Sequence, residues 1–63
     1  TMDPVACVAR ILSLIAAHDG EEARAACDDL RGWIARGGAR PHGWSPAECA
    51  AFLTMSYATA DAI

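Results

Sequence analysis

The chain has 63 residues and a formal net charge of −3, and all five of its cationic side chains are Arg. Folding at this length hides only about 60% of the surface of the unfolded chain, so we expect residues 1–63 to form a single domain with a small core. An acidic chain lacks the attraction for phosphate on which most nucleic-acid binding depends. Its 54% hydrophobic content disfavours disorder. We therefore expect a folded protein without a nucleic-acid partner.

No apolar stretch is long enough to cross a bilayer, which takes about 18 residues. The longest, Val5 to Ala17, is interrupted by Arg10 and Ser13. The basic opening of a secretory signal is also missing. We expect no membrane partner and a cytoplasmic location, and the abundance of Ala and Arg without Lys suggests a GC-rich, bacterial source.

The first helix is predicted over residues 4–18. Asp3 suits the N-cap and Pro4 the first turn, where no amide hydrogen bond is lost. Apolar residues then recur at helical spacing over about half of the circumference, against roughly 100° in an ordinary surface helix. These residues are Val5, Cys7, Val8, Ile11, Leu12, Leu14 and Ile15.

The second helix is predicted over residues 20–36. Asp19 and Glu22 have the spacing of a capping box, so the turn before this helix is short and the first two helices should be antiparallel. Gly37 tolerates the left-handed conformation that commonly ends a helix. The apolar stripe of this helix is narrow, and its other face is charged.

The third helix is predicted over residues 46–62. Ser45, Pro46 and Glu48 fit the cap, the first position and the third position of a capping box. Trp44 precedes the cap and is expected to pack on Cys49 as a hydrophobic staple. No strand pattern appears, and the sequence predicts an all-α, three-helix, up-down bundle.

The cysteines Cys7, Cys27 and Cys49 fall one per predicted helix, without a C-x-x-C pair. An odd number does not suit a disulfide framework, and buried cysteine commonly acts as a small hydrophobe. A metal site shared with His18 or His42 is disfavoured by the 1.5 Å rise per residue of a helix, because Cys27 should lie near the middle of its helix while Cys7 and Cys49 lie near the end opposite His18. We expect no metal and no cofactor.

The loop before the third helix combines cations with an aromatic residue and is a candidate binding site. The free amides of a helix N-terminus attract anions, although no phosphate-loop motif is present. The alternative is that the Trp only staples the helix and the Arg side chains are solvated. The candidate residues for an anion or a partner are Arg36, Arg40, His42, Trp44 and Ser45.

Two other classes of function are disfavoured. A helix-turn-helix has a turn of about 3 to 4 residues, whereas residues 37–44 form a longer connection, and residues 46–61 contain no Arg or Lys to hold phosphates. A nucleophile would need an adjacent base and an orienting group, and no such motif is visible. We expect the protein not to be an enzyme.

Association is the function that remains. The first helix is more apolar than two companions can cover, and the rest would form an exposed patch of the kind that marks protein contacts. A symmetric homodimer would cover it most simply. We predict a protein–protein interaction module, a regulator or adaptor, that binds a second copy or another protein through Val8, Ile11, Leu12 and Ile15. The alternative is a binder of a small anionic ligand at the 36–46 loop.

Overall fold

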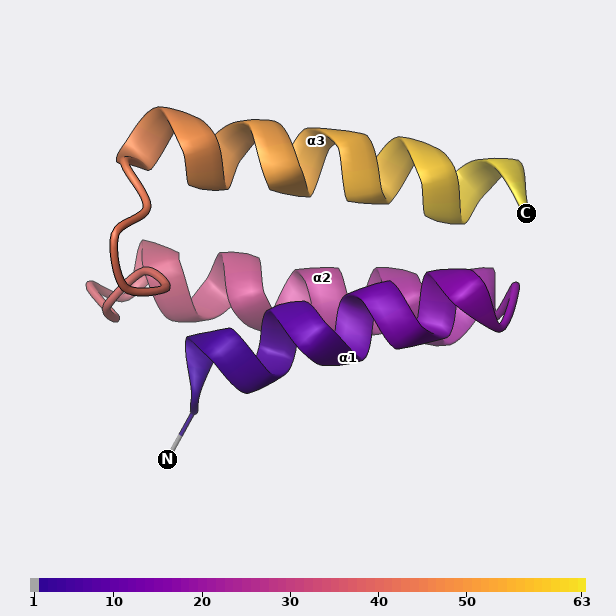
Figure 1. Cartoon of the computed structure of the whole chain (residues 1–63), viewed down its shortest axis with the longest axis horizontal. Helices are drawn as coiled ribbons and strands as arrows, with labels where there is room; N and C mark the ends of the chain where they lie inside the picture. Colours follow the sequence, from indigo (N-terminus) through magenta and orange to yellow (C-terminus); the bar gives the residue numbers. More distant parts are fainter. Residues whose placement is uncertain (1) are drawn as a thin grey trace.

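The computed structural model describes residues 2–63 and contains three helices, α1 (Pro4–Ala16), α2 (Gly20–Ala35) and α3 (Pro46–Ala62). The helices run alternately in opposite directions (Figure 1), so the prediction of an all-α, up-down, three-helix bundle is confirmed. Residues 2–63 contain no strand. Within residues 2–63, no helix is both long enough and apolar enough to cross a membrane.

The helix starts follow from the side chains at the caps. Asp3 Oδ1 accepts hydrogen bonds from the amides of Val5 at 3.0 Å and Ala6 at 3.3 Å. Asp19 Oδ1 accepts one from the amide of Glu22 at 3.2 Å. The reciprocal half of the predicted capping box does not form there, because the Asp19 amide donates instead to the carbonyl of Leu14 at 2.9 Å.

The first two helices end slightly earlier than predicted. The amide of His18 donates to the Ile15 carbonyl at 3.0 Å, and His18 takes a positive φ of 56°. This arrangement, together with the Asp19 bond, is a Schellman motif, which ends α1 at Ala16 rather than at residue 18.

The same motif ends α2, this time with the predicted glycine in place. Gly37 has a φ of 86° and donates to the carbonyl of Ile34 at 3.0 Å, while the Gly38 amide donates to that of Trp33 at 2.9 Å. The helix therefore stops at Ala35, one residue before the predicted end.

The core lies along α2, against which both other helices pack. Contact between α1 and α3 is much less extensive than the contact of either with α2. The largest fully buried side chains are Ile11, Leu30 and Cys27, so the core is small and centred on the α1–α2 interface. Because α1 and α3 share little contact, apolar side chains on both helices stay exposed where the two helices run beside each other.

Candidate binding surfaces

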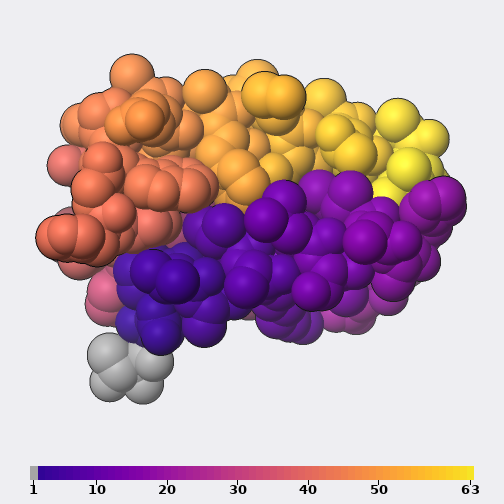
Figure 2. Space-filling model, viewed as in Figure 1, coloured from indigo at the N-terminus to yellow at the C-terminus, as the bar shows by residue number. Residues whose placement is uncertain are grey.

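The first candidate surface lies where α1 and α3 run beside each other. Figure 2 shows α1 (indigo to purple) and α3 (orange to yellow) side by side on one face of the molecule. A groove of about 260 Å³ follows their junction. Leu12 is 53% exposed at this groove and Met55 is 70% exposed. The groove is lined by Leu12, Ile15, Phe52, Met55, Ser56 and Thr59.

The four residues predicted to form the protein contact do not share one environment. Leu12 is exposed and Ile15 is half-buried, and both line the α1–α3 groove. Val8 is half-buried and packs against the core, whereas Ile11 is completely buried within it. Ile11 therefore belongs to the interior and not to any surface that a partner could touch. The predicted contact thus included one residue, Ile11, that the structure places in the core.

Charge is nearly absent from this face. Arg10 is the only charged residue within α1, and α3 carries none between Glu48 and Asp61. Arg10 itself leans towards α2, where its guanidinium lies 3.6 Å from a Glu22 carboxylate oxygen. The α1–α3 groove is thus uncharged and mainly apolar.

The loop between α2 and α3 is held by two tryptophans, Trp33 near the end of α2 and Trp44 within the loop. Trp33 Nε1 donates to the carbonyl of Ala39 at 2.9 Å. The Trp44 ring meets that of Phe52 edge to face, with centroids 5.3 Å apart. Trp44 therefore packs against Phe52 in the first turns of α3, and the predicted contact of Trp44 with Cys49 stays a prediction. Arg40 closes the loop by donating from Nε to the Trp44 carbonyl at 3.2 Å.

The start of α3 is occupied by its own capping box, as predicted. Ser45 Oγ accepts from the amide of Glu48 at 3.1 Å, and the Ser45 amide donates to Glu48 Oε1 at 2.8 Å. The hydrogen bond from the Ser45 amide, followed by the Ser45 hydroxyl, holds the pKa of the Glu48 carboxyl below its ordinary value of 4.5. Ser45 and Glu48 satisfy one another and leave little for an anion at this point.

Hydrogen bonds join only some of the five loop residues to their neighbours. Within residues 2–63, Arg40 is linked to Trp44 and Ser45 to Glu48, but no hydrogen bond or ion pair joins Arg36 or His42 to them. Arg36 is the C-cap of α2, and its guanidinium lies over Gly32 on its own helix. Of the predicted cations, Arg40 alone borders a groove.

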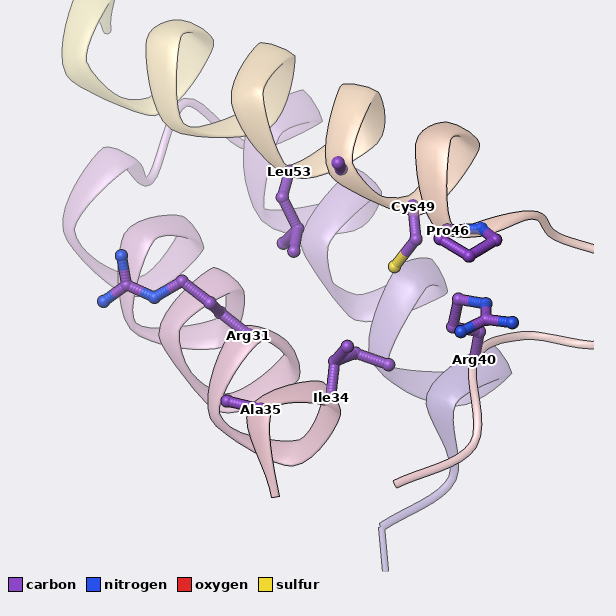
Figure 3. A pocket seen from close by; sticks show the side chains of 8 residues that line it. Arg31, Ile34, Ala35, Arg40, Pro46, Cys49 and Leu53 are labelled. Atoms are coloured by element: carbon purple, nitrogen blue, oxygen red, sulfur yellow. The ribbon is translucent and has the colours of Figure 1, made fainter. Parts of the chain in front are cut away.

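That second groove lies between the end of α2 and the start of α3 and was not predicted from the sequence. It has a volume of about 250 Å³. In Figure 3, Ile34, Cys49 and Leu53 point into the space between the helices, while Arg31 and Arg40 lie on opposite sides of them. Its lining is Arg31, Ile34, Ala35, Arg40, Pro46, Cys49, Ala50 and Leu53.

A polar cluster fastens α2 to α3 beyond this groove. The Tyr57 hydroxyl donates to Asp28, and the guanidinium groups of Arg24 and Arg31 lie 5.6 Å and 5.3 Å from its ring centroid. Burial, followed by the hydrogen bond to Asp28, raises the pKa of Tyr57 to about 12. Arg31 is also 3.6 Å from Asp28. Arg31 is therefore engaged within the protein.

The three cysteines are free and buried. Cys7 Sγ lies 3.6 Å from the carbonyl of Ala26, across the α1–α2 interface. Burial raises the pKa of the Cys7 and Cys27 thiols, which keeps them protonated and unreactive near neutral pH. Residues 2–63 hold no group of three His, Cys, Asp or Glu side chains arranged to bind a metal ion.

Comparison of the chain with protein-family models, with curated proteins and with solved structures found no match.

Proposed function

We propose that this protein is a small, non-enzymatic interaction module that pairs with a second copy of itself through the α1–α3 face. The observation that carries the proposal is the uncharged groove whose rims, Leu12 and Met55, are both large, apolar and more than half exposed. Large apolar side chains gathered around a groove favour removal from water by a partner. Three free thiols support a reducing compartment such as the cytoplasm.

A second copy fits this face better than a charged partner would. In a twofold interface the same surface occurs on both sides. The exposed Leu12 side chain of each copy would therefore enter the groove beside Met55 of the other copy. Most carboxylates lie elsewhere, with Glu21, Asp28 and Asp29 exposed on α2. Two copies that each carry −3 can therefore meet here without bringing those carboxylates together.

The character of the surface, rather than its extent, supports this association. The accessible surface is 3945 Å², and a monomeric globular protein of this mass exposes about 3,900 Å². The bundle is therefore as compact as an ordinary monomer. Pairing adds burial of apolar groups that the monomer leaves in water.

The test is the molar mass in solution by sedimentation equilibrium, at protein concentrations up to about 1 mM. We expect the wild type to reach twice the 6.6 kDa of one chain. A Leu12→Glu, Met55→Glu double variant should stay monomeric, because it places a carboxylate on each rim of the groove. Both positions are exposed, so the helical circular dichroism of the variant should be unchanged.

A matched control is Thr54→Glu, since Thr54 is exposed on α3 and lines neither groove. This variant should associate as the wild type does. A wild type that remains monomeric over the whole concentration range overturns the proposal that the protein pairs with a second copy of itself. Equal loss of association in Thr54→Glu would show that the interface lies elsewhere.

A further inference from the structure

The geometry points to a second site, the α2–α3 groove, as a binding site for a medium-chain carboxylate whose headgroup meets Arg40. This site is separate from the face proposed for pairing, and the groove's three central side chains, Ile34, Cys49 and Leu53, are apolar. A cationic end and an apolar floor match a ligand with one anionic group and an apolar tail.

The floor of the groove sets the size of the tail. From Pro46 to Leu53, the α3 side of the groove covers a helix length of about 10 Å at 1.5 Å per residue. Its volume of about 250 Å³ is below the range of about 300 to 1,000 Å³ for pockets that enclose drug-sized ligands. A single short alkyl chain fits this space, whereas a docked helix, about 10 Å wide with its side chains, does not.

The two arginines at the groove differ in what they can offer. Arg31 lies 3.6 Å from Asp28 and 5.3 Å from the centroid of the Tyr57 ring, so its guanidinium already has two partners within the protein. Arg40 uses only Nε, which donates to the carbonyl of Trp44, and it forms no ion pair with any residue between 2 and 63. The terminal nitrogens of Arg40 can therefore receive a carboxylate in the two-pronged manner typical of guanidinium.

These contacts also give the ligand a direction. With its carboxylate at Arg40, the tail lies along Ile34 and Leu53 towards the Arg31 end. A hydrophilic anion such as phosphate would leave this floor in contact with water and gain only the ion pair, which is weak at an exposed site. Apolar contact with the tail is needed to add binding energy, at about 25 cal/mol per Å² buried.

The test follows the methyl resonances of Ile34 and Leu53 by NMR while sodium octanoate is added to the full chain. We expect saturable shifts at these two residues with a Kd at or below about 1 mM. Arg40→Gln should raise this Kd about three- to tenfold, between the contributions of an exposed ion pair and of a buried charged hydrogen bond. Arg36→Gln is the matched control, because Arg36 is exposed and lines neither groove, and it should leave the Kd unchanged.

A ligand-side comparison removes any dependence on how the variants fold. Octan-1-ol has the same tail without the charge and should bind the wild type about three- to tenfold more weakly than octanoate. Equal binding of the alcohol, equal effects of the two Arg variants, or octanoate shifts confined to Leu12 and Ile15 in the other groove would each overturn the inference. Inorganic phosphate shifting the same methyl groups as strongly as octanoate would also do so.

Discussion

His18 is the only residue other than glycine with a positive φ among residues 2–63. Its value of 56° is in the left-handed region, where the Cβ of an L-residue lies too close to the following carbonyl oxygen. The Schellman bonds at the end of α1 require this conformation. The tight turn from α1 to α2 is therefore formed at a steric cost, which a glycine would not carry.

Replacing His18 with Gly should stabilise the protein. We expect the free energy of unfolding in urea to rise by about 0.5 to 1 kcal/mol, because relief of the left-handed strain outweighs the greater entropy of Gly in the unfolded chain. His42→Gly is the control, since His42 is exposed in the loop and has no positive φ. It should be neutral or destabilising. A His18→Gly protein less stable than the wild type would show that the imidazole makes a contribution of its own.

At this scale the sequence was a good guide, because capping depends on residues close together along the chain. Asp3, Asp19 and Ser45 all cap the helices that they were predicted to cap. The second half of the capping box at Asp19 is missing for a local reason, because the Asp19 amide already donates to a carbonyl of the preceding turn. The left-handed conformation of His18 could not be predicted in this way, because nothing in the neighbouring residues marks it.

At the scale of the helices, two glycines of α2 have opposite surroundings. A Cβ placed on Gly20 would lie 2.4 Å from the backbone carbonyl oxygen of Ala60, so the first turn of α2 packs directly on the end of α3. A Cβ on Gly32 would meet only a terminal nitrogen of Arg36, at 3.3 Å. One glycine allows the helices to approach, while the other merely weakens a helix.

Alanine at these two positions should change stability in opposite directions. Gly20→Ala should destabilise the fold by about 1 to 3 kcal/mol, because backbone must move to admit the methyl group. Gly32→Ala should stabilise it by up to about 1 kcal/mol, the difference in helix propensity, since the flexible Arg36 can move aside. Thermal unfolding followed by circular dichroism measures both changes. Equal effects at the two sites would contradict the close packing of α2 on α3.

The grooves show what helical periodicity leaves open. Phe52 and Leu53 are consecutive residues of α3 that both pack against the core, and both are half-buried, but they border different grooves. One groove lies between α1 and α3 and the other between α2 and α3, so each depends on the spacing of two helices, which the periodicity of a single helix does not give. Arg40 was a candidate residue from the loop composition alone, but the apolar residues that line the groove with it, Ile34 and Leu53, come from two different helices.

For the whole molecule, stability depends on very few large side chains. Ile11 and Leu30 are the two bulky residues that are fully buried, and the remaining core is mainly Ala and Cys. A domain of this length has a total stability of about 3 to 9 kcal/mol at typical values per residue. Removing either large side chain would therefore take away a sizeable part of that total.

Leu30→Ala should lower the free energy of unfolding by about 2 to 5 kcal/mol. Leu12→Ala removes the same atoms from an exposed position and should change stability by less than about 1 kcal/mol in dilute, monomeric protein. Urea unfolding of the two variants at low concentration provides the comparison. Similar losses for both would mean that Leu12 contributes to the interior, contrary to its exposure in the structure.

The two tryptophans are fixed at the same end of the bundle, Trp33 on the Ala39 carbonyl and Trp44 on the Phe52 ring. The opposite end, where α1 turns into α2 beside the last turn of α3, has no indole. Tryptophan emission would consequently report on loosening of the 36–45 connection, while fraying of the helix ends around His18 would lower the helical circular dichroism without changing the emission. A mismatch between the emission and circular dichroism melting curves would thus measure how independently the two ends open.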